Sequence, residues 1–168
     1  MITYKNKAQP LDIIVVYNPK SWLHHLIHRV TGYKAGHVAI YMGDGMITEA
    51  GSGGVIRRTW KNYKSGSRVY LARVLSLTES QELKIREYCF ESERRPYAFG
   101  QLIMILIKNL FRVRHVPDVS RQAVICSEFI ALVFKSAGVV LCPKVHTWET
   151  TPGDILKSEV VFLVKGWE

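Results

Sequence analysis

The sequence predicts an α+β fold, in which a small antiparallel sheet, open or barrel-like, packs against helices. Three stretches carry this prediction. Residues 37–50 alternate between two faces on either side of a glycine-rich turn, as a β-hairpin does. Residues 11–17 form a run rich in Ile and Val that is apolar except at Asp12, which is typical of a buried strand. Residues 126–137 repeat apolar side chains at helical spacing, which indicates a helix with one face against a core.

Length and composition indicate one domain over residues 1–168. With 48% hydrophobic residues, a chain of 168 residues can bury a sizeable core. Its three cysteines are an odd number, and its first seven residues are polar and basic instead of resembling a signal peptide. We therefore expect cytoplasmic synthesis and no disulfide scaffold. The longest apolar run, Leu102 to Ile107, is too short to span a bilayer, so no transmembrane segment is expected.

The formal net charge of +9 favours acidic partners. Nucleic acid, anionic lipid and an acidic peptide or cell-wall polymer all qualify. The sequence has no helix-turn-helix, zinc-finger or RNP-type pattern, so nucleic acid is the least expected of these, and steep salt dependence of binding would be its signature. The basic loop 112–121 and the helix predicted at 22–30 suit an acidic polymer or an anionic membrane surface.

After the first strand, Asn18 and Pro19 resemble a helix cap followed by a first-turn proline. The helix predicted at 21–30 then separates two kinds of side chain. Its apolar side is Trp22, Leu23, Leu26, Ile27 and Val30, and its polar side is His24, His25, His28 and Arg29. His24 and His28 lie one turn apart, as two metal ligands could. No third ligand follows at a recognised spacing, so we predict a solvated polar face and no metal.

The hairpin admits two registers, and they differ in chemistry. A two-residue Asp-Gly loop would pair Ile40 with Glu49 and turn the carboxylate to the face away from His37. A three-residue loop, with Gly45 in the left-handed conformation, would pair Ala39 with Glu49 and place the carboxylate diagonal to His37 on one face. We favour the second register, because it gives an imidazole held by a carboxylate.

The remaining elements follow from turn and cap signals. The predicted strands are 55–58, 68–74 and a last buried strand at 160–164, preceded by a turn at 151–154. A capping box at Thr78–Gln81 begins a helix that runs to about Ser92. A helix at 102–111 is expected to be buried and followed by a basic surface loop; the alternative is a flap that touches lipid or another acidic ligand.

Cys126 lies in the first turn of its predicted helix. Unpaired N–H groups and the helix dipole favour a thiolate there. A histidine on a neighbouring strand could deprotonate the thiol, and a third polar residue would fix the imidazole tautomer. Cys89, in the middle of a helix, and Cys142, in a loop beside Pro143, are interpreted as structural.

Three motifs resemble those of the NlpC-type papain-like cysteine peptidases. Residues 37–50 are similar to the family's histidine motif, a strand beginning His-Val-Gly-Ile-Tyr followed by a glycine turn and a strand with the third catalytic residue. Residues 126–129, Cys-Ser-Glu-Phe, resemble its Cys-Ser-Gly-Phe motif, and residues 96–100 resemble its Pro-Tyr-x-x-Gly segment. The histidine motif comes first here, as in the circularly permuted branch, which includes bacterial and poxviral proteins and the lecithin:retinol acyltransferase-like enzymes.

The resemblance implies a circularly permuted NlpC-type papain-like fold and a cysteine hydrolase without a cofactor. Cys126 would be the nucleophile, His37 the base and then the acid, and Glu49 the residue that orients His37. Tyr97 and Tyr17 are the candidates for oxyanion stabilisation or substrate positioning, beside the N–H of Cys126.

The same resemblance leaves the substrate open. It implies a peptide or peptidoglycan-like amide first, and a lipid ester or acyl transfer second. A catalytically silent binding module on this fold is the competing interpretation. The chain departs from the peptidase pattern at Ile125, where many members have Asp, and at Glu128, where they have a small residue; it also lacks the acyltransferases' Asn-Cys-Glu-His signature.

Overall fold

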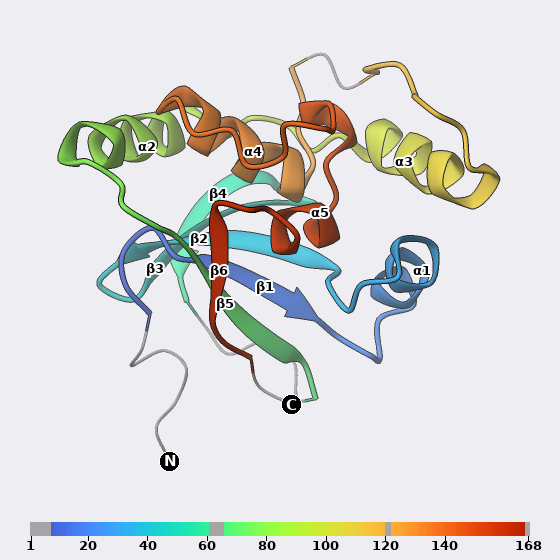
Figure 1. The fold of residues 1–168 in the computed structure, drawn as a ribbon, viewed down its shortest axis with the longest axis horizontal. Coiled ribbons are helices and arrows are strands. Elements are labelled where there is room, and N and C mark those ends of the chain that lie inside the picture. Colours follow the sequence, from blue (N-terminus) through green and yellow to red (C-terminus); the bar gives the residue numbers. More distant parts are fainter. Residues whose placement is uncertain (1–7, 61–65, 120–121, 167–168) are drawn as a thin grey trace.

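The computed structural model describes residues 8–60, 66–119 and 122–166 (Figure 1). Six strands form one sheet in the order β4-β3-β2-β1-β5-β6, and every neighbouring pair is antiparallel. The strands are β1 (Ile13–Tyr17), β2 (His37–Gly43), β3 (Met46–Gly51), β4 (Gly54–Thr59), β5 (Arg68–Val74) and β6 (Val161–Gly166). The prediction of an α+β fold with an antiparallel sheet packed against helices is confirmed.

Helices cover the sheet on one side and extend beyond its end (Figure 1). They are α1 (Trp22–Thr31), α2 (Glu79–Glu91), α3 (Phe99–Phe111), α4 (Cys126–Ser136) and α5 (Pro152–Leu156), with a 3₁₀ turn at Thr147–Glu149. The main core lies between the sheet and α2, α4 and α5, and a smaller cluster around Trp60 lies on the opposite face of the sheet. None of the described helices is long and apolar enough to cross a membrane.

Cap and stop signals are read correctly at α2 and α4. Thr78 and Gln81 form the predicted capping box, and the helix ends next to Ser92. The apolar stripe of α4 is buried, and Gly138 takes the left-handed conformation (φ 79°) just after the helix.

The prediction for α1 is wrong in two respects. Ser21, not Asn18, caps the helix, because the Ser21 side chain accepts from the His24 N–H while Asn18 accepts from the Lys20 N–H. The helix also turns differently from the predicted amphipathic pattern. Trp22 is 76% exposed, and the His24 ring lies so close to Gly36 that a Cβ there would collide with it.

Three later predictions are corrected. The helix predicted from residue 102 begins at Phe99 and is not buried, since a stripe of its apolar side chains faces solvent. Residues 151–154 begin the short helix α5, which Thr151 caps, instead of forming a simple turn. The last strand is not buried either: Phe162 and Leu163 are exposed because β6 lies at the edge of the sheet among the described strands.

The β2–β3 hairpin has the predicted register, reached by another geometry. Gly43 pairs with Met46 around a two-residue Asp-Gly turn whose residues both have positive φ (50° and 71°). An irregularity between Tyr41 and Gly43 then shifts the ladder by one residue, so that Tyr41 pairs with Ile47. Continued toward His37, that register brings the side chain of Glu49 to the histidine.

Candidate active site

Cys126 is the first residue of α4, and Ile125 is its N-cap. The helix packs against β2 and β3, and its N-terminus lies near the beginning of β2, where Cys126 meets His37 and the Val38 N–H. The cysteine is 6% exposed, and its sulfur accepts hydrogen bonds from the backbone N–H groups of Val38 and Ser127. These donors stabilise a negative sulfur at a helix start.

His37, the first residue of β2, lies between the thiol and a carboxylate. Its Nε2 is 2.8 Å from Oε2 of Glu49 on β3. This bond leaves Nδ1 as the ring nitrogen that can bond to Cys126. Only 20% of the imidazole and 10% of the carboxylate side chain are exposed, so water competes little with this contact.

The pKa values of the pair are shifted in opposite directions. Burial lowers the pKa of His37, but the hydrogen bond with Cys126, the charge of the thiolate and the contact with Glu49 outweigh burial and raise it to about 10. Burial raises the pKa of Cys126, but His37 and the two backbone N–H groups outweigh it, so the net shift is downward. The pair therefore favours thiolate and imidazolium over thiol and imidazole.

The other two cysteines show the opposite shift, although the charge of Arg86 lowers the pKa of Cys89 in part. Burial raises the pKa of Cys89 to about 12 and that of Cys142 to about 12. Both thiols stay protonated at neutral pH, which agrees with a structural role.

Tyr97 lies beside Cys126, in a segment that is hydrogen-bonded to Val124 on one side and to the β3–β4 turn on the other. Tyr97 and Val124 form a parallel bridge, with the Val124 N–H donating to Pro96 O at 2.9 Å. Burial, followed by the charge of Cys126 and a hydrogen bond to it, raises the pKa of Tyr97, so its hydroxyl remains a donor.

The segment before Tyr97 is also bonded to the β3–β4 turn. The Val55 N–H donates to Arg95 O at 2.8 Å, and the Arg94 N–H donates to Val55 O at 2.8 Å. Gly54 completes this contact, because a Cβ there would lie 2.5 Å from Arg95 O. The strands that carry the carboxylate and the segment that carries the tyrosine are thus joined by backbone bonds.

Arg58 on β4 is a site residue that the sequence prediction missed. Its Nε donates to Oε1 of Glu49 at 2.6 Å, so each carboxylate oxygen has one partner. Burial alone would raise the pKa of Glu49, but His37 and Arg58 together lower it. The sequence contains a signal for this residue, the glycines at positions 51 and 54. In the register in which Gly51 pairs with Gly54, Glu49 pairs with Ile56, and Arg58 lies diagonal to Glu49.

Tyr17, the other predicted positioning residue, contacts α1. Its hydroxyl is 3.4 Å from Nδ1 of His25, and its ring contacts the rings of His24 and His28 on α1. His24, in turn, is close to the site: burial and the charge of His37 lower its pKa to about 4, so it stays neutral.

Glu128 replaces the small residue of the peptidase motif and is buried in the first turn of α4. Its carboxyl caps the Ile125 N–H at 3.4 Å. Burial raises the pKa of Glu128 to about 7, with Asp118 adding to the rise and the Ile125 N–H and Arg95 opposing it. Its role in this structure is to complete the helix start that carries Cys126.

A narrow apolar cleft leads to Cys126 between α1 and α3. Its walls are mainly aliphatic, from Leu23, Ile27 and Val30 on one helix and Leu102, Ile105 and Leu106 on the other. Tyr97, Ser127, Thr150 and Thr151 lie around its inner end. The free volume is about 30 Å³, room for one or two water molecules, so a substrate can enter only if the walls separate.

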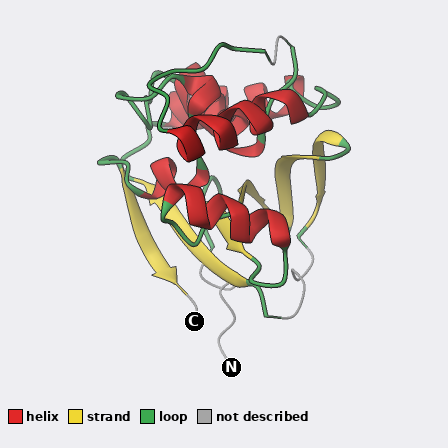
Figure 2. Cartoon of the chain, turned by 90° about the vertical axis from the view of Figure 1, so that its right-hand side faces the viewer, coloured by secondary structure: helices red, strands yellow, loops and turns green. Residues whose placement is uncertain are grey.

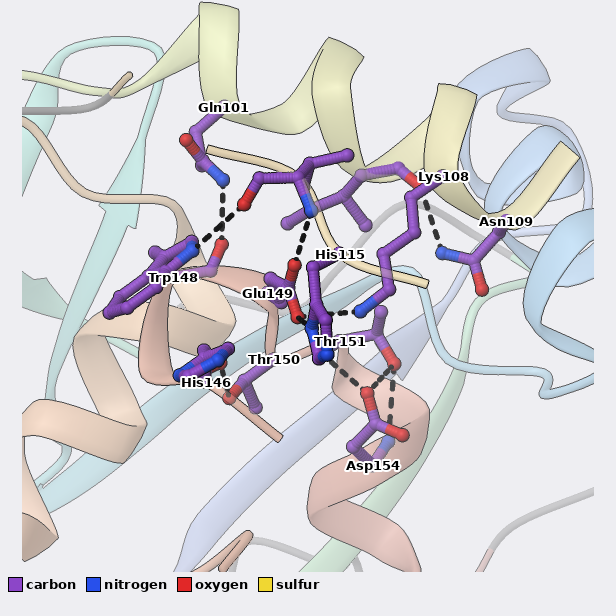
Figure 3. Close-up of polar contacts among 12 residues, drawn as sticks. Gln101, Lys108, Asn109, His115, His146, Trp148, Glu149, Thr150, Thr151 and Asp154 are labelled. Carbon is purple, nitrogen blue, oxygen red and sulfur yellow. Dashed lines mark hydrogen bonds and ion pairs between the residues drawn. The ribbon is translucent and has the colours of Figure 1, made fainter. Parts of the chain in front are cut away.

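Polar contacts fix the α3 wall (Figure 3). Glu149 is buried and accepts from Lys108 Nζ at 2.7 Å and from the Val116 N–H at 2.6 Å. Gln101 donates to Trp148 O at 3.0 Å, and the Trp148 indole donates to Val116 O at 3.2 Å. These bonds tie α3 and the loop after it to the 3₁₀ turn beside α4.

The described part of the chain contains no group of three His, Cys, Asp or Glu side chains that could hold a metal ion. His24 and His28 both contact Tyr17 instead.

Comparisons with known proteins bear on the fold of this chain and not on its function. No family model matches the chain, and no curated protein matches it. Among solved structures, it is similar to the metalloprotein YiiX of Escherichia coli O157:H7 (DUF1105), with 16% sequence identity and a TM-score of 0.69. The match covers 94% of this chain and 96% of that one. The likeness therefore extends over the whole architecture, whereas the metal is a property of that protein.

Proposed function

We propose that this chain is a cysteine hydrolase of the circularly permuted NlpC-type papain-like branch, which cleaves an amide through a thioester acyl-enzyme. One observation carries the proposal: His37 lies between the Cys126 thiol and the Glu49 carboxylate, with opposite pKa shifts in the thiol and the imidazole. A buried thiol whose pKa is lowered, next to an imidazole whose pKa is raised, is typical of an activated nucleophile and its proton partner.

The proposed reaction has two steps that balance. The thiolate of Cys126 attacks the substrate carbonyl carbon and forms a C–S bond, while the imidazolium of His37 gives its proton to the leaving amine as the C–N bond breaks. A water molecule then attacks the thioester, and the neutral imidazole takes a proton from it. The C–S bond breaks, and a carboxylic acid, the thiolate and the imidazolium result.

Neighbouring residues supply orientation and charge stabilisation. Glu49 fixes the ring through Nε2 and favours the imidazolium, and Arg58 holds the carboxylate from its other oxygen. The Tyr97 hydroxyl and the backbone N–H of Cys126 are the candidate donors for the oxyanion. Tyr17, whose hydroxyl faces His25, has no part in this proposal.

A second candidate substrate class has its own support. The walls of the cleft are almost wholly aliphatic, as suits the acyl chain of a lipid ester better than a charged peptide. The same thioester chemistry would then hydrolyse an ester or transfer an acyl group.

A side-by-side turnover assay tests the function and separates the substrates. The parent and the Cys126→Ala variant would be given muropeptide-like amides, phospholipids and nitrophenyl esters of increasing chain length. Turnover that is lost in Cys126→Ala supports a cysteine hydrolase, and a preference for long acyl chains selects the lipid ester. Equal turnover by both proteins would refute the assignment of Cys126.

A further inference from the structure

The outer surfaces of α1 and α3 form an apolar and basic face beside the cleft. Figure 2 views this side directly, with α3 above α1. We propose that this face docks the protein on an anionic lipid membrane. This proposal does not depend on whether Cys126 is catalytic.

The first observation is an exposed apolar stripe on α3. Phe99, Ile103, Ile107 and Phe111 follow one another at intervals of four residues, about one helical turn. Leu110 lies next to Phe111, and all five are exposed. Phe111 is 70% exposed, and Val113 in the loop after it is exposed as well. Contiguous apolar surface of this kind marks an interaction site.

The second observation is that α3 is held with this stripe outward. Its inner side carries the buried Gln101 and Ile105 and the ion pair of Lys108 with Glu149 (Figure 3). Rotating the helix to bury the stripe would break that pair and leave a charge buried without its partner, which is costly. The exposure therefore belongs to the folded state.

The third observation is the tryptophan on α1. Trp22 is 76% exposed at the start of the helix, next to Leu23 in the cleft wall. An indole with an apolar body and one N–H donor suits the boundary between lipid and water.

The charge of this face indicates which kind of partner it binds. The chain has 14 acidic residues, but none lies between residues 13 and 43 or between residues 94 and 117, the segments that contain α1 and α3. The exposed basic side chains of these segments are Lys20, Arg29, Lys34, Arg112 and Arg114. Lys20 and Arg29 line one shallow depression together with Trp22. Apolar and aromatic side chains flanked by basic ones, without acidic ones, fit an anionic lipid surface.

Vesicle binding tests the proposal. The parent chain and Cys126→Ala would be sedimented with phosphatidylcholine vesicles prepared with and without phosphatidylglycerol. We expect both proteins to bind only the anionic vesicles, and equally, because docking does not need the thiol. Absent turnover with intact binding would then count against the enzyme and not against the surface.

Paired variants locate the binding face. Removing two basic charges with Arg29→Gln and Arg114→Gln should weaken the partition coefficient by about 30-fold, at about 1 kcal/mol for each charge. Replacing two apolar side chains with Leu110→Ser and Phe111→Ser should weaken it further. The matched control is Leu83→Ser with Phe90→Ser on α2, which are also exposed and should leave binding unchanged.

Trp22 provides an optical readout of the same event. Its emission should shift to shorter wavelength when anionic vesicles are added, and Trp22→Phe should abolish the shift. Binding that the α1 and α3 variants do not weaken, or that the α2 control weakens equally, would overturn the proposal. Binding to soluble polyglutamate but not to vesicles would also overturn it and would identify an acidic polymer as the partner.

Discussion

Replacing His37 by alanine should convert Cys126 from a reactive thiolate into an ordinary or sluggish thiol. The histidine is the main reason that the pKa of this cysteine lies below its usual value of 9.0. Without it, the N–H groups of Val38 and Ser127 remain as donors, but burial acts unopposed by a cation. Buried thiols elsewhere in the chain show the direction, since burial raises the pKa of Cys89 to about 12.

The size of the effect follows from the thiolate fraction. A thiol with a pKa at or above 9.0 is about 1% ionised or less at pH 7, so the variant would have about 100-fold less thiolate than a fully ionised parent. A more basic thiolate is also a better nucleophile, and a rise of about two pKa units offsets about tenfold of this loss of thiolate. Alkylation at pH 7 should therefore slow by about tenfold or more.

The assay is the pH dependence of iodoacetamide modification, with Cys89→Ser and Cys142→Ser in every protein so that a single thiol reports. The parent should react fast well below pH 8, and the His37→Ala rate should rise only at higher pH. His25→Ala, which removes an exposed histidine of α1, is the matched control and should behave as the parent. An ordinary thiol profile in the parent, unchanged by loss of His37, would refute the proposed pair.

Three further predictions concern charges. Burial raises the pKa of Glu128 from 4.5 to about 7, so the folded state holds this proton more tightly than the unfolded state. The resulting contribution to the free energy of unfolding is full below about pH 4.5 and is lost as the pH rises through 7. Glu128→Gln should remove this pH dependence of about 3 kcal/mol, which in the parent should appear as a change in Tm of about 6–12 °C between acidic and alkaline buffers. Arg58→Gln should raise the pKa of Glu49 and move the thiol alkylation profile to higher pH while the fold, followed by circular dichroism, persists; an unmoved profile would show that the arginine only braces the strand. Arg73→Met should cost about 3–5 kcal/mol in chemical unfolding, because the fully buried Asp12 loses its two guanidinium bonds of 2.6 and 2.8 Å, and a cost near zero would contradict this account.

The contact between the histidine and the carboxylate could be predicted from sequence, but the turn that produces it could not. Alternation and a glycine-rich loop limited the hairpin to two registers, and the better chemistry selected the observed one. The structure reaches it with a two-residue turn, instead of the predicted three-residue loop, combined with an irregularity between Tyr41 and Gly43. Such irregularities depend on what packs around a strand, which local sequence does not specify.

The misassigned surfaces have a related cause. An apolar helical pattern shows that a helix has apolar positions, but it does not say which of them meet the core. Trp22 and Phe111 were expected inside on this ground, and they lie outside because α1 and α3 pack mainly on each other beyond the end of the sheet. Arg58 was missed for a different reason: its partner lies on the neighbouring strand, and the prediction followed only one hairpin.

The difference in how the two cleft walls are attached has a mechanical consequence. The carboxylate strands, the tyrosine segment and α3 are joined to the rest of the molecule by backbone bonds or buried ion pairs. The other wall, α1, meets α3 through the apolar side chains of Leu23, Ile27 and Val30. It is tied to the end of β1 by two side-chain contacts, from the Asn18 N–H to Nδ1 of His24 at 2.9 Å and between the Tyr17 hydroxyl and Nδ1 of His25 at 3.4 Å. With so little free volume in the cleft, we expect α1 to be the wall that moves: displacing it would break these two side-chain contacts, whereas displacing α3 would break the buried ion pair of Lys108 with Glu149. The cleft could then open without changing the spacing of the catalytic side chains. Amide hydrogen exchange should accordingly be faster in α1 than at Val55 and Arg94, whose N–H groups are hydrogen-bonded to each other's segments.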